Sequence, residues 1–289
     1  MPFRRCPSIF ACVKQKITSL ASLLGLALAV VTNAIAQPKP ETLAAFDRYV
    51  NQAETQMLHE ESSPDSFLGL ASLPAVRAQV EKQIRNGKVL VYRRRSKEAE
   101  IPEGLIHDWV GIAFLPNVTI AQTTAFLQDY DHLARYYAPE VISSRLIARN
   151  ADDFQIAMRL RKHNVITVVL DTQYNVRYGQ LDAAHQYSLS RSTQISEVPE
   201  SSSQQSVVPD HGLLWRLNTY WRFEQQPDGV TAECEAISLT RDIPTGLGWL
   251  VAPYIQKIPR ESLEFTLDST RKGVLERAQA NPSKREVLR

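Results

Sequence analysis

The sequence has little cysteine, and this limits how the fold can be stabilised. Cysteine occurs only at positions 6, 12 and 234 of the 289 residues. Two of these lie in the basic and apolar N-terminal segment, so the rest of the chain has Cys234 alone and forms no internal disulfide. A single cysteine without a histidine or basic cluster close in sequence is more often a small buried apolar residue than a reactive thiol. The fold is therefore expected to depend on its hydrophobic core.

Motifs that mark catalytic, metal or cofactor sites are also lacking. The sequence contains no Gly-x-Ser-x-Gly, His-Glu-x-x-His, Walker, dinucleotide-binding or Cys-x-x-Cys pattern. Its six histidines are scattered, and no pair has the helix-face spacing of metal ligands. His107-Asp108 and Asp131-His132 each place an aspartate beside a histidine, but adjacent residues on a strand point to opposite faces. We therefore predict neither a metal nor a cofactor.

No strong excess of charge of one sign is present. The formal net charge is +2, which does not favour nucleic acid as a partner. The basic run Arg93–Arg95, at the end of the segment 88–95, is predicted to be a solvated face, and transient contact with a membrane surface is the alternative.

The longest apolar run is too short to cross a membrane. Residues 20–31 follow four basic residues and precede Ala34-Ile35-Ala36, a small-x-small cleavage site. A membrane-spanning helix needs about 20 apolar residues. Residues 1–36 are therefore predicted to be a signal peptide, with an uncleaved membrane anchor as the alternative, and the protein is predicted to be periplasmic or extracellular. Loss of this segment would change the formal charge from +2 to −2.

Hydrophobic periodicity divides the remaining chain into a helical extension and a strand-rich domain. The extension, 37–103, has predicted helices at 41–59 and 74–87, a short strand at 88–95 and a linker beginning at 96. The domain, 104–280, has a long helical stretch at 245–279 and a helical pair at 119–137. Its seven predicted strands lie at 105–115, 141–149, 154–162, 165–177, 185–198, 212–225 and 230–240. A flexible tail, 281–289, follows, and the predicted class is α+β with an antiparallel sheet.

The segment 213–223, LLWRLNTYWRF, alternates between an apolar and a charged face. With Asp228-Gly229 as a two-residue turn, the aromatic face lies opposite the small residues of the next strand. This arrangement predicts a concave apolar face. Arg216 and Arg222 alternate with it and are predicted to be surface charges paired with Glu233 and Glu235.

Polar side chains predicted to face the same side are fewer. The odd positions of 185–195 form the more apolar face of that strand, which places Arg191 inside. With His163-Asn164 as a turn, Asp171 falls on the face of Met158. The alternative is a position at the sheet rim in water, because a register slip of one residue reverses the assignment.

The order of elements resembles the helix-grip fold of the START and Bet v 1-like superfamily, in particular its polyketide cyclase-like and coenzyme Q-binding-like branches. The similar segments are GLIHDWVGIAFLPNVTIAQTTAFLQDYDHLARYYAPEV, at 104–141, and IPRESLEFTLDSTRKGVL, at 258–275. The resemblance implies a curved seven-stranded antiparallel sheet around the C-terminal helix, with a hydrophobic cavity between them. The predicted pocket residues are Trp109, Tyr136, Tyr137, Met158, Asp171, Tyr187, Leu189, Arg191, Trp215, Leu217, Thr219, Trp221, Phe223, Tyr254 and Ile258.

Three functions are compatible with these patterns. The first is a non-catalytic, exported protein that binds a hydrophobic small molecule or lipid. The second is a cyclase or dehydratase-type enzyme, which requires at least two of Asp171, Arg191 and His107 to converge in the cavity as acid–base groups. The third is a structural or interaction protein with a filled core, whose N-terminal helices bind a partner. Fold alone does not decide among them.

Overall fold

The computed structural model describes residues 37–72, 74–95, 99–163, 167–199, 213–242 and 257–280. The predicted signal peptide, the tail 281–289 and Tyr254 lie outside the described residues. Among the helices that are described, none is long and apolar enough to cross a membrane.

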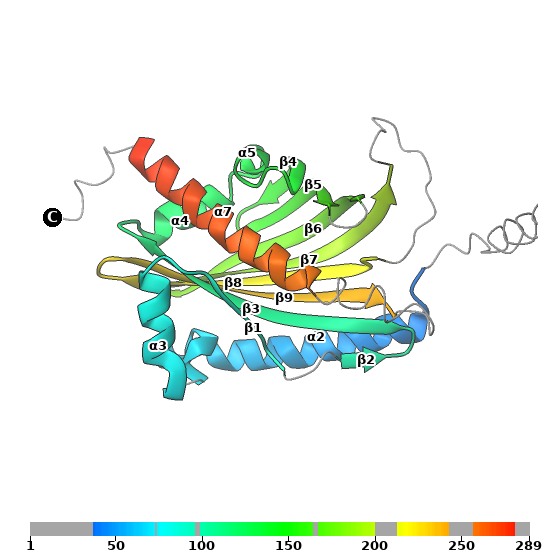
Figure 1. Cartoon of the computed structure of the whole chain (residues 1–289), viewed down its shortest axis with the longest axis horizontal. Coiled ribbons are helices and arrows are strands. Elements are labelled where there is room, and N and C mark those ends of the chain that lie inside the picture. The colour runs from blue at the N-terminus through cyan, green and yellow to red at the C-terminus, as the bar shows by residue number, and fades with distance from the viewer. Residues whose placement is uncertain are drawn as a thin grey trace, which may run out of the picture. The chain divides into compact units, whose positions relative to one another are not determined.

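A large antiparallel sheet forms the centre of the molecule (Figure 1). Its strand order is β1-β3-β9-β8-β7-β6-β5-β4, and β2 pairs with the end of β3. The strands are β1 (Leu90–Arg93), β2 (Ala99–Ile101), β3 (Gly104–Pro116), β4 (Val141–Asn150), β5 (Asp153–His163), β6 (Thr167–Asp182), β7 (His185–Val198), β8 (Arg216–Gln226) and β9 (Gly229–Arg241).

All seven predicted strands are present, and two more come from the predicted N-terminal extension. Strand β1 was expected, but β2 lies in the segment that we predicted to be a linker. Both pair with β3, so the sheet continues across the predicted boundary at residue 103. The described sheet consequently has nine strands instead of seven.

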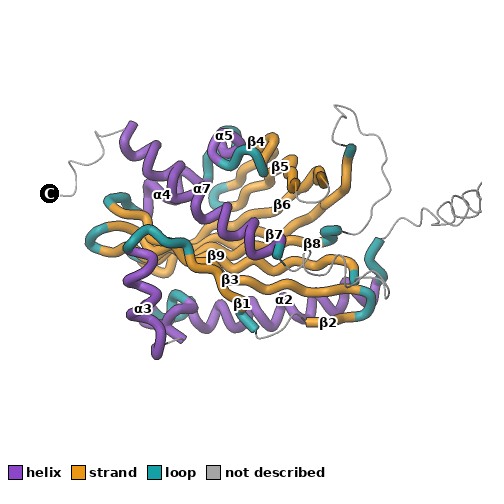
Figure 2. The backbone as a smooth tube through the Cα atoms, in the orientation of Figure 1, coloured by secondary structure: helices purple, strands orange, loops and turns teal. Residues whose placement is uncertain are grey.

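Helices lie on both sides of this sheet (Figure 2). The concave side holds α4 (Ile120–Leu127), α5 (Leu133–Tyr136) and the long α7 (Ile258–Ala280). The convex side holds α2 (Pro40–Glu60), two short 3-10 turns and α3 (Pro74–Arg85). A curved antiparallel sheet around a long C-terminal helix is the predicted helix-grip architecture, which is therefore confirmed.

Two glycines allow α7 to approach its neighbours closely. A Cβ on Gly111 of β3 would lie 2.3 Å from Leu267 Cδ1 and 3.1 Å from Leu263 Cγ. A Cβ on Gly273 of α7 would lie 2.4 Å from the Phe126 ring of α4. The absence of both side chains therefore determines how near α7 lies to β3 and to α4.

The convex face is covered by α2, whose apolar side packs on β3, β8 and β9. Phe46, Tyr49 and Met57 of α2 form a core cluster with Trp215 and Ile237. The sheet is thus buried on both faces. The prediction that the charged face of residues 213–223 is solvated is wrong for this reason.

Charged side chains buried between α2 and the sheet form what we call the ionic cluster: Glu60, Arg94, Asp108, Arg222, Glu233 and Glu235. Arg222, only 1% exposed, lies 2.7 Å from Glu60 Oε2 and 2.6 Å from Glu233 Oε1. Arg94 also pairs with Glu60. These residues form internal ion pairs, and those of Glu60 connect the C-terminal end of α2 to the sheet. Arg222 is therefore a buried charge and not a surface charge.

Candidate functional site

The concave face of the sheet can be followed row by row across its strands. One row runs from Trp109 of β3 through Ala236, Thr219 and Ser190 to Val176, and Phe154 of β5 ends it. Small side chains thus occupy the middle of the row, on β9, β8 and β7, and larger apolar ones occupy both ends. Strand pairing therefore produces a shallow floor between two walls.

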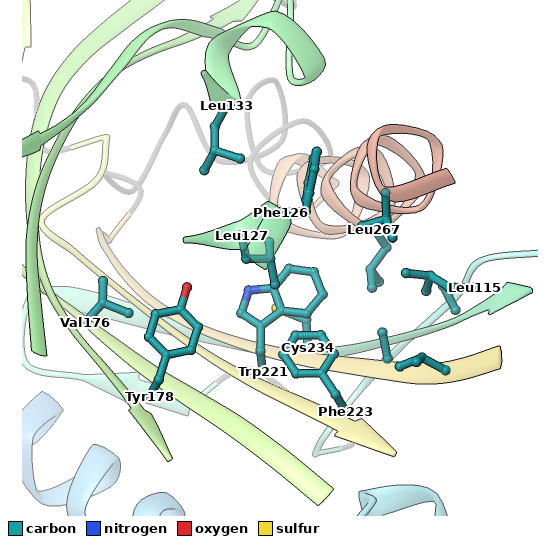
Figure 3. Close-up of a cluster of buried hydrophobic side chains, with 14 of the residues drawn as sticks. Leu115, Phe126, Leu127, Leu133, Val176, Tyr178, Trp221, Phe223, Cys234 and Leu267 are labelled. Atoms are coloured by element: carbon teal, nitrogen blue, oxygen red, sulfur yellow. The ribbon is translucent and has the colours of Figure 1, made fainter. Parts of the chain in front are cut away.

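The next cross-strand row on the same face contains two large aromatic side chains, Trp221 and Tyr178, beside this floor. Trp221 of β8 pairs with Cys234 on one side and with Ser188 on the other, and Tyr178 lies opposite Ser188. The Trp221 ring stacks on Phe223, with ring centres 5.6 Å apart and an interplanar angle of 13°. Figure 3 shows Trp221 and Phe223 on the sheet, with Leu127 and Leu267 on the helix side.

Tyrosine hydroxyls on the concave side form hydrogen bonds between different elements. Tyr130 and Tyr178 share a hydrogen bond of 2.8 Å, and Tyr137 shares one of 2.6 Å with Thr270 of α7. Burial raises the pKa of Tyr178 well above its ordinary value, and it raises the pKa of Tyr174 to about 12. These phenols therefore remain protonated at neutral pH and serve as neutral hydrogen-bonding groups.

Several apolar side chains around the gap are less completely buried than the core itself. Met158, Leu217, Ala236 and Phe265 are only partly buried where they pack against the core. Ile258, the first residue of α7, is also half-buried. The stretch 243–256, which includes Tyr254, lies outside the described residues.

Four polar groups on the floor form what we call the polar belt: Trp109 Nε1 and the hydroxyls of Ser188, Ser190 and Thr219. Trp109 is 8% exposed, and its Nε1 is fully buried without a hydrogen-bond partner in the described structure. The three hydroxyls also have no side-chain hydrogen bond there, and none is among the fully buried unpartnered atoms. These three hydroxyl oxygens are therefore not fully buried, although their residues lie on the covered face of the sheet.

The predicted pocket residues divide between the two faces. On the concave side lie Trp109, Tyr136, Tyr137, Met158, Leu217, Thr219, Trp221 and Phe223. On the convex side lie Asp171, Tyr187, Leu189, Arg191 and Trp215. Trp215 precedes β8 and packs with α2, so it does not continue the aromatic face of that strand.

The facing of Asp171 and Arg191 was predicted wrongly, and the reason is register. Residue 163 pairs with 167, so the connection is longer than the predicted two-residue turn, and Asp171 lies opposite Arg159 on the outer face. Arg159 Nε donates to Asp171 Oδ1 at 2.7 Å. Arg191 pairs instead with Glu54 of α2, because the apolar odd-numbered face of β7 contacts α2.

The required convergence of acid–base groups does not occur. Of the three candidates only His107 lies on the concave side, where its Nε2 is 3.0 Å from Thr240 Oγ1. Within the described residues no cluster of histidine, cysteine, aspartate or glutamate could hold a metal ion. Cys234 is buried, and burial raises the pKa of its thiol well above the ordinary value, so it is not an activated nucleophile.

Our sequence-based prediction missed Ser188 and Ser190, which face the gap. The pattern that could have identified them is the alternation of serine with apolar residues along HQYSLSRS, at 185–192. We assigned the apolar set to the inside, which is correct only for a sheet with one buried face.

A separate cleft of about 490 Å³ lies at the edge of α7, outside the gap. Its lining residues are Gly87, Val89, Glu261, Glu264, Phe265, Asp268 and Arg271. Charged side chains predominate there, so this cleft is poorly suited to an apolar ligand.

We compared this chain with protein families, with curated proteins and with solved structures, and only the solved structures include matches. No family model matches the chain, and no curated protein does. A STAR-related lipid transfer protein from Xanthomonas axonopodis is 17% identical, with 61% of this chain and 98% of that chain covered and a TM-score of 0.39. Human STARD10 is 11% identical over 71% and 81% of the two chains, with a TM-score of 0.43. The Zhui aromatase/cyclase from Streptomyces sp. R1128 is 11% identical over 61% and 95%, with a TM-score of 0.39.

The chain has a helix-grip fold. The strand order and the helices of the chain itself establish this fold, since the identities and TM-scores above carry no argument of their own. The chemistry of the helix-grip gap must therefore be argued from its own residues.

Proposed function

We propose that this protein binds a hydrophobic small molecule or lipid, without catalysis, between the concave face of the sheet and α7. The observation that carries the proposal is the row Ala236, Thr219 and Ser190, three small side chains side by side under an otherwise apolar gap. Protein cores are normally packed as densely as organic crystals. Adjacent small residues between bulky walls therefore favour a site for an additional molecule.

The position of α7 supports the same interpretation. It packs closely on the sheet at Gly111 of β3, and Ser190 lies three strands away, on β7. A ligand over Thr219 and Ser190 would contact Trp221 and the partly buried Met158 and Leu217. Removing apolar surface from water contributes about 25 cal/mol per Å², which makes such a contact favourable for a lipid chain or an aromatic ring.

Ser190→Leu tests this proposal, because it fills the floor with a side chain that the gap would otherwise leave to a ligand. Ser143→Leu, on the exposed side of β4, makes the same change outside the gap. We expect the purified protein to release a bound lipid into organic solvent, as detected by mass spectrometry, and to take up N-phenyl-1-naphthylamine. Ser190→Leu should reduce both, and Ser143→Leu should reduce neither. A protein that carries no lipid and takes up no probe would contradict the proposal.

We also propose that the protein acts outside the cytoplasm. The support is the pattern of residues 1–36, in which basic residues, a short apolar run and Ala34-Ile35-Ala36 follow one another. Expression of the full chain should yield an exported product, and its intact mass should match a chain that begins at Gln37. Deletion of residues 2–36 should retain it in the cytoplasm. A full-length product in the membrane fraction would support the anchored alternative.

A further inference from the structure

We infer that the ligand carries a neutral oxygen, such as a carbonyl, ether or hydroxyl, which the polar belt binds and for which Trp109 Nε1 is a hydrogen-bond donor. This inference rests on the proposed function, and it names the chemical class of molecule that the gap selects. Its basis is the coincidence, in one cross-strand row, of an unpartnered buried donor and two hydroxyls that have no side-chain hydrogen bond in the described structure and are not fully buried.

The indole of Trp109 is held in place from the side of β1. Arg93 is its cross-strand partner, and the Arg93 guanidinium carbon lies 4.9 Å from the centre of the Trp109 ring. Trp109 is also part of the core cluster on the concave side. A donor that is fixed in an apolar environment without an acceptor is unfavourable, and an oxygen of a ligand would relieve that cost.

The hydroxyls extend this donor across the sheet. Thr219 and Ser190 are directly paired neighbours, and Ser188 lies on the same face of β7, two residues from Ser190. Ser188 and Ser190 are 4% and 8% exposed. A hydroxyl both donates and accepts, so the belt can satisfy an oxygen together with any hydrogen that it carries.

The composition of the belt indicates what it excludes. A pure hydrocarbon over the floor would cover the hydroxyls without giving them partners, which weakens binding, and it would leave the indole N–H unpartnered as before. The belt groups are all uncharged, so they offer no ion pair to a carboxylate or phosphate. A neutral, mostly apolar molecule with an oxygen part-way along its surface fits both conditions.

Two probes of nearly equal size distinguish these cases: pyrene, which is a hydrocarbon, and 1-acetylpyrene, which adds a carbonyl. We expect the full-length protein to bind 1-acetylpyrene about tenfold more tightly than pyrene; this ratio corresponds to about 1.4 kcal/mol, which is the size of one net hydrogen bond. Energy transfer from tryptophan and equilibrium dialysis would measure both affinities. Dialysis alone would be used for Trp109 variants.

Trp109→Phe keeps an aromatic ring and removes the donor, and Thr219→Val keeps the shape and removes a hydroxyl. Each should lower the ratio of the 1-acetylpyrene affinity to the pyrene affinity several-fold, because only the carbonyl probe loses a hydrogen-bond partner. Thr193→Val, on an exposed position of β7, is the matched control and should keep the full preference. If Trp109→Phe does not fold, Thr219→Val and Ser190→Ala still provide the test.

The outcomes separate this inference from the proposed function. Equal binding of the two probes by the unmodified protein would overturn the selection for oxygen but would agree with an apolar binding site. A preference that persists undiminished in Trp109→Phe and Thr219→Val would overturn the role of the belt. Failure to bind either probe would contradict the proposed function itself.

Discussion

Replacement of Arg222 by methionine should destabilise the protein more than any single change at an exposed ion pair. Arg222 is 1% exposed and contacts Glu60 at 2.7 Å and Glu233 at 2.6 Å. Glu60 would keep Arg94 as a partner. Glu233, which is fully buried, would keep a hydrogen bond of 3.0 Å from the Gly69 amide but would lose its closest cation among the described residues. Removing one member of a buried ion pair costs about 3–5 kcal/mol, because the other charge remains buried.

The assay is urea-induced unfolding, followed by tryptophan fluorescence at neutral pH. Arg159→Met is the matched control, since Arg159 forms a bidentate pair with Asp171 on the more accessible part of the outer face. Its loss should cost less than about 1 kcal/mol. The excess destabilisation of Arg222→Met should also shrink towards acidic pH, because a carboxylate without its guanidinium takes up a proton more readily.

The double variant Arg222→Met/Glu233→Leu makes the test sharper. If the cost comes from an unpaired buried charge, removal of that charge should restore much of the stability. A single variant that unfolds within about 1 kcal/mol of the Arg159→Met control would refute the assignment of Arg222 to a buried cluster. A double variant that is less stable than the single one would refute the proposed cause.

Three further changes have defined outcomes. Burial raises the pKa of Glu61 from 4.5 to about 7, so the folded state binds this proton more tightly than the unfolded state does. The resulting contribution to the free energy of unfolding should be lost as the pH rises from about 4.5 through about 7. Glu61→Gln should therefore flatten this part of the plot of stability against pH. Gly111→Val should displace α7, cost about 1–3 kcal/mol by overpacking and speed amide hydrogen exchange in α7; unchanged exchange would contradict the close approach. Cys234 should react with a thiol reagent only upon unfolding, and rapid labelling of the native protein would show that it is not buried.

The secondary structure was predictable because local patterns determine it. Strand β7 lies at 185–198, as predicted, and α2 extends over 40–60 where 41–59 was predicted. The turn between β8 and β9 is Pro227-Asp228 and not Asp228-Gly229, since Gln226 pairs with Gly229. Each residue of β8 therefore pairs with a residue of β9 two positions earlier than predicted. A shift by an even number of positions leaves every side chain on its predicted face, so Leu217, Thr219, Trp221 and Phe223 face the concave side as predicted.

The direction in which a strand faces was less predictable, because it depends on connections and bulges. In β6 the prediction was off by an odd number of positions, which moved Asp171 to the other face. The pairing of β6 with β7 shifts again between Gln173 and Tyr174. An irregularity of one residue reverses every side chain beyond it, and nothing in the local pattern identifies where it occurs.

Burial of the charged face follows from the requirements of the two long helices. The predicted helix at 41–59 carries Leu43, Phe46, Val50 and Met57 on one side and needs an apolar partner. Once the C-terminal helix occupies the concave face of the sheet, the convex face is the extended surface that remains for it. Covering that face necessarily buries Arg222 and Glu233, and this burial is stable because Arg222 pairs with both Glu233 and Glu60. The floor row of the gap, in contrast, is left with uncharged polar groups, and these suit a neutral ligand better than an ionic one.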